Sequence, residues 1–189
     1  MPAKWSSDMA DEKSSDLVLE TPRLILRPHR LEDFEACCFL ASDTDAQHLV
    51  THRVLDRERA WQRMLGMLGH WRIMGYGLLL IEEKVSRRVV GEVGYAQSLR
   101  GLGPDFDSWP ELSWMVSSDA HGHGYPTEAV QVIQKWLDDT YEFERTVCMI
   151  DPHFAAPRHT AERLGFHFYG HGEYAGRPIT KLRRIRLHD

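Results

Sequence analysis

The stretch that most constrains this chain is residues 111–136, where a strand pattern passes through a glycine turn into a helix pattern. Leu112, Trp114 and Val116 occupy every second position, and this period of two places their side chains on one face of a strand. After the turn, apolar residues recur every three or four positions, as along the buried stripe of a helix: Ala129, Val130, Val132, Ile133, Trp136 and Leu137. The pattern predicts a strand–turn–helix unit that organises the rest of the fold.

The turn favours an anion-binding site. It consists of His121, Gly122, His123, Gly124 and Tyr125. Its glycines let the backbone approach a ligand, and the first amides of the following helix point at the turn from the positive end of the helix dipole. No Lys follows the glycines, which excludes a Walker P-loop, and Thr127 stands where the dinucleotide fingerprint needs a third glycine. Another phosphate-bearing ligand is one interpretation, and a plain strand–helix connection is the other.

Composition narrows the class of protein. A chain of 189 residues with 42% hydrophobic and 27% charged residues fits one globular domain. A formal net charge of −5 argues against a nucleic-acid surface, which would be basic. No apolar run is long enough to span a bilayer, and the start of the chain has no signal-sequence pattern, so we expect no membrane partner and a cytoplasmic location. The three cysteines lack the spacing of a metal or disulfide framework, and we expect no metal.

The remaining patterns predict a mixed sheet with helices packed on it. Residues 1–15 are polar and aperiodic, which is typical of a disordered tail, and residues 16–189 form one domain. We expect strands at 17–27, 77–83, 89–95, 111–116 and 146–150, helices at 31–42, 57–74, 125–137 and 155–164, a surface loop at 97–110, and a closing hairpin at 166–187. In that loop, Asp105 and Asp107 either attract a cationic amine or are solvated surface.

Several motifs resemble one known family. They are T-P-R-L-I-L-R-P at 21–28, V-V-G-E-V-G-Y at 89–95, E-L-S-W-M-V at 111–116, H-G-H-G-Y-x-T-E-A at 121–129 and A-E-R-L-G-F at 161–166. With this order of elements, the chain resembles the GNAT superfamily of acetyl-CoA-dependent N-acetyltransferases, nearest the ribosomal-protein-alanine N-acetyltransferase type. The resemblance implies an α/β (α+β) fold with a mostly antiparallel central sheet, flanking helices and a V-shaped CoA cleft. It also implies acetyl-CoA as co-substrate and direct transfer to an amine acceptor, a protein N-terminus or a small molecule, by a monomer or homodimer.

The resemblance also assigns candidate site residues. Glu111 is the candidate general base, with a structural salt bridge as its alternative, and Glu92 is the substitute base. Backbone N–H groups near Met115 or Val116 are expected to stabilise the oxyanion and to bond the CoA arm. The candidate CoA-binding residues are Met115, Val116, His121, Gly122, His123, Gly124, Tyr125 and Phe154. Separately from the resemblance, three tyrosines either protonate the leaving thiolate or serve packing: Tyr125, Tyr169 and Tyr174.

Four positions depart from the family pattern. Pro126 replaces the last small residue of the turn and removes an N–H. Phe154 and Pro157 stand where the family has Asn and Ser, and Ala161 where many members have a Tyr. These departures motivate the alternative of a CoA- or ligand-binding module with reduced turnover. Two further alternatives are a metal site at His121 and His123, against polar turn residues, and a nucleophilic Cys148, against a buried inert thiol; we favour the second of each pair.

Overall fold

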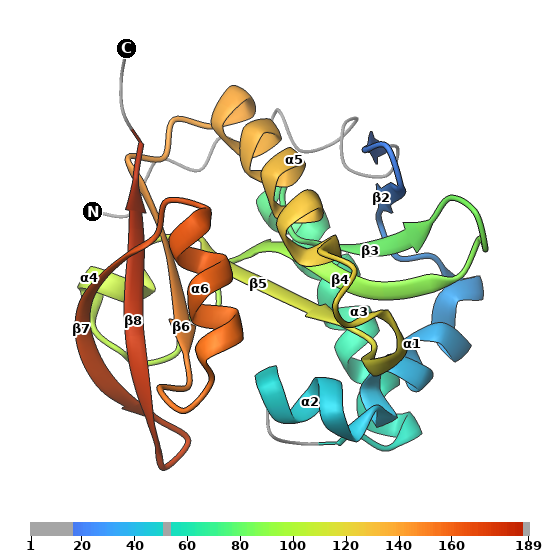
Figure 1. The fold of residues 1–189 in the computed structure, drawn as a ribbon, viewed down its shortest axis with the longest axis horizontal. Coiled ribbons are helices and arrows are strands. Elements are labelled where there is room, and N and C mark those ends of the chain that lie inside the picture. The colour runs from blue at the N-terminus through green and yellow to red at the C-terminus, as the bar shows by residue number, and fades with distance from the viewer. Residues whose placement is uncertain (1–16, 51–53, 187–189) are drawn as a thin grey trace.

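The computed structural model describes residues 17–50 and 54–186, and the expected disordered tail at 1–15 lies outside these ranges. Sixteen elements follow one another in the order in which Figure 1 colours them, among them the 3-10 helices η2 (Leu31–Asp33) and η3 (Ser118–Ala120). None of the helices in the described ranges is both long and apolar enough to span a membrane. The description below concerns these residues.

One sheet of eight strands forms the centre of the molecule. The strands are β1 (Leu19–Glu20), β2 (Leu24–Arg27), β3 (Leu78–Glu83), β4 (Val89–Ala96), β5 (Glu111–Val116), β6 (Arg145–Ile150), β7 (His167–Tyr174) and β8 (Arg177–Ile185). Their spatial order is β1-β2-β3-β4-β5-β6-β8-β7, and all neighbours are antiparallel except β5 and β6, which run parallel. The predicted mixed, mostly antiparallel sheet is confirmed.

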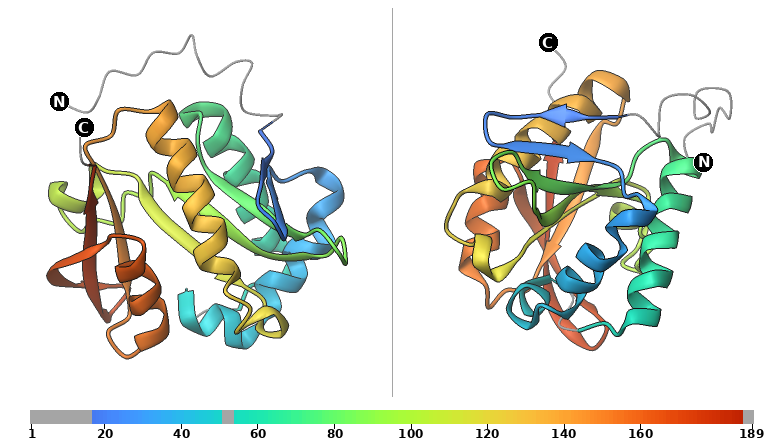
Figure 2. Two further views of the ribbon diagram at one scale, coloured as in Figure 1. Left: turned by 45° about the horizontal axis from the view of Figure 1, so that its top comes forward. Right: turned by 90° about the vertical axis from the view of Figure 1, so that its right-hand side faces the viewer.

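Helices cover both faces of this sheet. They are α1 (Phe34–Ser42), α2 (Thr44–Val50), α3 (Arg57–Met74), α4 (Pro104–Asp107), α5 (Tyr125–Thr140) and α6 (Ala155–Arg163). Figure 2 shows α5 on one side of the central strands and α3 on the other. Tyr95, Leu112 and Val116 belong to the core cluster under α5, whereas Leu80 and Met115 belong to a second cluster with residues of α1 and α3. The strand β5 is therefore buried on both faces, which places the predicted strand–turn–helix unit at the middle of the molecule.

The predicted limits of α3 coincide with its caps. Asp56 precedes the helix, and its Oδ1 accepts a hydrogen bond from the Arg59 amide at 2.9 Å. Gly75 ends the helix, and its N–H donates to the carbonyl of Trp71 at 2.9 Å. Both are local signals that a sequence displays directly.

Two short helices were not expected. The helix α2 follows α1 after one residue, Asp43, whose Oδ1 accepts a hydrogen bond from the Ala46 amide at 3.0 Å. The helix α4 lies inside the expected surface loop, and Pro104 stands in its first turn. Seven and four residues are too few for an apolar period of 3.6 to become visible.

Candidate functional site

The strands β5 and β6 separate from each other and open the sheet. Their ladder contains a single pair, Glu111 with Val147, next to which the Val147 amide donates to the carbonyl of Pro110 at 3.0 Å. Beyond this junction the strands diverge, as Figure 1 shows. A cleft of about 980 Å³ fills the opening, with residues 112–116 of β5 on one wall and 149–151 on the other.

The backbone of β5 turns alternate amides towards this cleft. Ser117 donates to Val90 of the β4 side at 2.8 Å, whereas the carbonyl of Pro110 accepts from β6 on the opposite side. Because successive residues point their N–H and C=O groups to opposite edges, we infer that Trp114 and Val116 face the opening and Met115 faces β4. Of the two amides predicted from the sequence, the Val116 amide faces the cleft and the Met115 amide does not. The second amide that faces the cleft is that of Trp114, two positions before Val116.

The glycine turn closes one end of the cleft. Gly122 and Gly124 have φ values of 80° and 74°, in the left-handed region that glycine tolerates best. Open space surrounds the position that a Cβ of Gly122 would take. The turn residues that line the cleft are His121, Gly122, Gly124, Pro126 and Thr127. The expected anion site is thus open to the cleft, with Gly124 as the N-cap of α5.

The hairpin of β1 and β2 braces this turn from outside. Arg23 donates from Nη1 to the carbonyl of His123 at 2.9 Å, and from Nε to Oε2 of Glu128 at 2.7 Å. Thr21 donates from Oγ1 to the other oxygen of Glu128 at 2.5 Å. The Tyr125 hydroxyl donates to Glu83. These contacts fix the turn, and they direct Tyr125 away from the cleft, whose lining residues do not include it.

Glu111 lies on the cleft wall in a fixed ion pair. Its Oε2 accepts from Nε of Arg100 at 2.8 Å, and Arg100 donates from Nη1 to the Tyr174 hydroxyl at 3.0 Å. The guanidinium also lies over the Tyr174 ring, 4.8 Å from its centroid. All three side chains line the cleft. The salt bridge anticipated as the alternative role of Glu111 is present, and its Oε1 has no hydrogen bond to the described residues.

Glu92 lies behind the cleft wall. Its two oxygens accept from Nη1 and Nη2 of Arg63 at 2.8 and 2.5 Å, and Nε2 of His29 lies 3.1 Å from Oε1. Burial by itself would raise the pKa of this carboxyl, but the charge and hydrogen bonds of Arg63 and His29 hold the pKa well below its usual range. Glu92 does not line the cleft, whereas Arg63 does. This environment favours a permanently ionised carboxylate over a base that takes up a proton.

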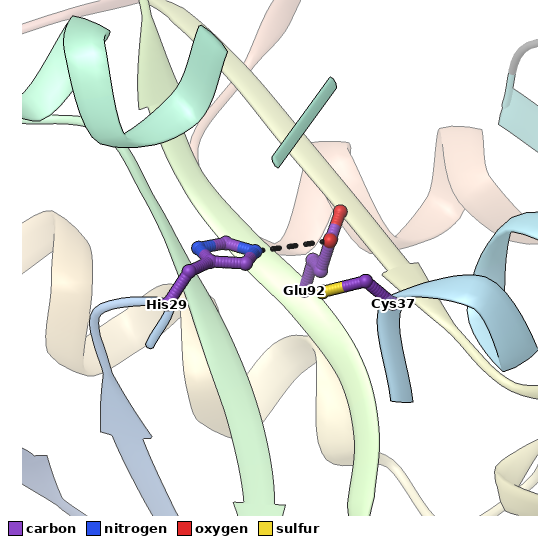
Figure 3. Close-up of side chains that lie close together, drawn as sticks. All are labelled: His29, Cys37 and Glu92. Atoms are coloured by element: carbon purple, nitrogen blue, oxygen red, sulfur yellow. Dashed lines mark hydrogen bonds and ion pairs between the residues drawn. The ribbon is translucent and has the colours of Figure 1, made fainter. Parts of the chain in front are cut away.

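His29, Cys37 and Glu92 form the group of possible metal ligands shown in Figure 3. Their ligand atoms lie within 4.8 Å of one another, and all three residues are buried. However, Arg63 already occupies both oxygens of Glu92, and burial together with the charge of Glu92 raises the pKa of the Cys37 thiol to about 12. A metal ion would have to displace the guanidinium and the thiol proton. We therefore interpret the group as part of the buried ion-pair network around Glu92.

The histidines of the turn make contacts of another kind. Nε2 of His121 lies 3.2 Å from the carbonyl of Val116, and Nδ1 of His123 lies 3.1 Å from the carbonyl of His121. Neither belongs to a group of three possible metal ligands among residues 17–50 and 54–186. These contacts agree with the interpretation as polar turn residues.

The structure places the residues that depart from the family pattern and the other candidate side chains. Phe154 is the N-cap of α6 and is not on the cleft wall, whereas Pro157 is. Ala161 is fully buried in the core. Of the tyrosines considered as proton donors, Tyr174 lines the cleft, while burial raises the pKa of Tyr169 to about 12. Cys148 is fully buried and burial raises its pKa, as expected for an inert thiol.

The two aspartates of α4, Asp105 and Asp107, contact neighbouring residues of the fold. Nζ of Lys181 lies 3.2 Å from Oδ2 of Asp105, and Oδ2 of Asp107 accepts from the Gly103 amide at 3.1 Å. Neither aspartate lines the cleft. Their position gives no support to direct attraction of an amine.

Comparison with known proteins identifies the family. A family model described as the acetyltransferase (GNAT) domain matches residues 23–167. A Bordetella pertussis protein described as a GNAT-family acetyltransferase is 31% identical over 89% of this chain and 99% of its own, with a TM-score of 0.80. An acetyltransferase of Agrobacterium tumefaciens (24% identity, 91% and 96% coverage, TM-score 0.76) shares the fold. The same fold is found in RimL, a ribosomal L7/L12 alpha-N-protein acetyltransferase in complex with coenzyme A (16% identity, 89% and 98% coverage, TM-score 0.73).

The family match covers the braced turn, the divergent strands and both glutamate–arginine pairs. The resemblance carried by the sequence motifs is confirmed. The chain belongs to the GNAT family of acetyltransferases.

Proposed function

We propose that this acetyltransferase moves the acetyl group of acetyl-CoA to a primary amine, on a protein N-terminus or a small molecule, by direct attack within a ternary complex. The observation that carries the proposal is the opening between β5 and β6, because a single cleft joins the edge of β5, the glycine turn and Glu111. RimL, which shares the fold, was solved with coenzyme A, which supports the same ligand here.

The cleft offers distinct sites for the parts of CoA. The pyrophosphate would lie against the amides of Gly122, Gly124 and Thr127 at the start of α5. Arg163 of α6 lines the same cleft and adds positive charge. The pantetheine arm would extend the sheet along Trp114 and Val116, in the place that a continuing β6 strand would take. Pro126 lacks one amide, but the neighbouring amides remain.

Acetyl transfer needs a neutral amine, an oriented carbonyl and a stabilised oxyanion. In the proposed reaction, Glu111 accepts the amine proton, directly or through a water molecule, on the oxygen that Arg100 leaves free. The amine nitrogen then bonds to the acetyl carbon, the C–S bond breaks, and the thiolate leaves with a proton from solvent or from Tyr174. An amide of β5 that faces the cleft, at Trp114 or Val116, donates to the oxyanion.

Measurement of thiol release from acetyl-CoA with a panel of amines tests this proposal. We expect Glu111→Gln to lower kcat by at least about 100-fold, the usual contribution of a general base, with unchanged CoA affinity. Glu142→Gln changes the same group on an exposed residue and serves as the control. Unchanged turnover in Glu111→Gln would show that Glu111 has only the structural role of pairing with Arg100.

The second candidate function is a CoA-binding module with reduced turnover. The ion pair of Glu111 with Arg100 favours it, because the carboxylate already has a structural partner in the cleft wall. Tight CoA binding without thiol release for any amine in the panel would support this function and contradict the first.

A further inference from the structure

We infer that the acceptor end of the cleft recognises a peptide-like amine carrying a carboxylate a few residues from its amino group, through Arg63 and Arg100. This inference rests on the proposed function, because it concerns the second substrate of the same cleft. It assigns to the two glutamate–arginine pairs a part in selecting the acceptor.

The two pairs lie on one face of the sheet. Glu92 pairs with Met115 across β4 and β5, and Glu111 pairs with Ala96. Since Glu92 and Ala96 are four positions apart, both glutamates share the face covered by α1 and α3. Four residues at ~3.4 Å each separate them by about 14 Å, a distance that an extended peptide of about four residues would span.

This face is opposite the one that the CoA turn serves. The turn leads into α5, which packs against the alternate residues of β5, Leu112 and Val116. With CoA on the side of α5, the cleft on the side of α3 remains for the acceptor. Arg63 of α3 and Arg100, the partners of the two glutamates on this face, line the cleft, as does Arg177.

The arginines have donors to spare. A guanidinium carries five N–H groups. Arg63 donates two of them to Glu92, and Arg100 donates one to Glu111 and one to Tyr174. Within residues 17–50 and 54–186, each therefore keeps three N–H groups without a protein acceptor.

Both arginines are partly exposed. The Arg63 side chain is 32% exposed while its partner Glu92 is 2% exposed, and Arg100 is 25% exposed while Glu111 is 4% exposed. Each guanidinium is thus held by a buried carboxylate, and both arginines line the cleft. A planar, immobilised guanidinium with a free edge is suited to bind a carboxylate with two parallel hydrogen bonds.

The charge of this region favours an acidic acceptor over a polycation. Each pair is neutral as a unit, and Arg177, at the turn between β7 and β8, has no ion pair with another described residue. The remaining N–H groups of these guanidinium groups can only donate hydrogen bonds. An acidic side chain near an amino terminus would accept them, whereas a polyamine offers no acceptor.

Calorimetry on the CoA-saturated protein tests the inference without needing turnover. The probes are the tetrapeptide amides Ser-Ala-Glu-Glu and Ser-Ala-Gln-Gln, which differ only in charge. We expect the acidic peptide to bind about 10- to 100-fold more tightly, as charge-assisted hydrogen bonds allow. Equal affinities in the parent protein would overturn the inference.

Variants assign the preference to its residue. Arg63→Gln should bring the acidic peptide close to the affinity of its amide counterpart and leave the amide peptide unchanged. Arg59→Gln, one turn earlier on α3, is the matched control, because Arg59 is 68% exposed and does not line the cleft. Its preference should equal that of the parent protein. An undiminished preference in both Arg63→Gln and Arg100→Gln would contradict the assignment.

Arg63→Gln leaves Glu92 without its main partner, so the melting temperature and CoA affinity of each variant are measured first. If Arg63→Gln does not fold, the parent peptide pair and Arg100→Gln decide the question. Failure of this inference and failure of the proposed function are distinguishable. Acetyl transfer without charge preference would remove only the inference, and charge preference without thiol release would remove only the function.

Discussion

The two ends of the cleft differ in the groups that line them. At the end proposed for CoA, the groups are backbone amides at Trp114, Val116 and the glycine turn, and side chains serve mainly to brace them. At the end proposed for the acceptor, the groups are side chains of Arg63 and Arg100, fixed by glutamates on neighbouring strands. A backbone site depends on local φ values and changes little when side chains vary, whereas a side-chain site depends on pairs that are distant in the sequence. On this proposal, side-chain substitutions at the acceptor end would change specificity while CoA binding persists.

The largest expected effect is on the acceptor side. Arg63→Met should lower the free energy of unfolding by about 3 kcal/mol, because it leaves the buried Glu92 carboxylate with only His29. Chemical denaturation of parent and variant measures the difference. The control is Arg59→Met, for which we expect a change within about 0.5 kcal/mol.

The pH dependence of this loss has a definite sign. In the parent protein the pKa of Glu92 is held below the ordinary value of 4.5, so its stabilisation is complete above that pH and is lost as the pH falls towards the folded-state pKa. In Arg63→Met the buried carboxyl is easier to protonate. The gap between parent and variant should therefore narrow below about pH 4.5. A gap independent of pH would assign the loss to packing.

The next effect concerns the backbone site. Pro126→Ala restores an N–H in the first turn of α5, and we expect CoA to bind at least about tenfold more tightly, since a hydrogen bond to a charged group contributes ~1.5–3 kcal/mol. Calorimetry with CoA measures it. Melting temperatures without ligand show whether the substitution alters the helix itself. No gain would mean that this amide does not face the pyrophosphate.

A third prediction compares a glycine of the turn with a glycine inside a helix. Gly124→Ala places a Cβ on a residue with a φ of 74° and should cost about 1–2 kcal/mol of stability. Gly66→Ala, inside α3 with open space around the new Cβ, should instead stabilise the fold by about 0.5–1 kcal/mol. Thermal denaturation compares the two variants. The same sign for both would contradict the strained geometry assigned to the turn.

The smallest expected effect tests the brace. Arg23→Gln removes a half-exposed ion pair with Glu128 and should change stability by less than about 1 kcal/mol. It also removes the hydrogen bond to the carbonyl of His123, so CoA affinity should fall by more than stability alone would explain. Calorimetry beside thermal denaturation makes this comparison. Equal affinity in the variant would show that the turn keeps its shape without Arg23.

Local signals in the sequence predicted most of the fold. The alternation on β5, the apolar stripe of α5, and the caps Asp56 and Gly75 of α3 all lie within a few residues of the elements they define. The helices α2 and α4 escaped prediction because they are shorter than a recognisable period. The prediction of an anion site at the glycine turn rests on a local signal too, because its chemistry belongs to consecutive residues.

The acceptor end could not be predicted in the same way. Arg63 meets Glu92 across 29 positions, and Arg100 meets Tyr174 across 74 positions. No local pattern marks these partners, and Glu92 looks like any other strand carboxylate until the fold places a guanidinium and an imidazole beside it. The direction of the Trp114 amide is predictable in part. The alternation along β5 gives it, but only after the fold shows which edge of β5 faces the cleft.

The single residue pair that joins β5 and β6 also bears on how the strand edges could pair with other chains. Each strand carries an unpaired edge inside the molecule, and a free strand edge is a template onto which foreign chains can add. Here the edges diverge from the Glu111–Val147 junction, so an intruding strand could not pair with both along its length. A ligand that hydrogen-bonds to β5 occupies one of these edges and, at 100 times its Kd, stabilises the folded chain by about 2.7 kcal/mol. Bound co-substrate would thereby occupy the edge of β5 that a foreign strand would need for pairing.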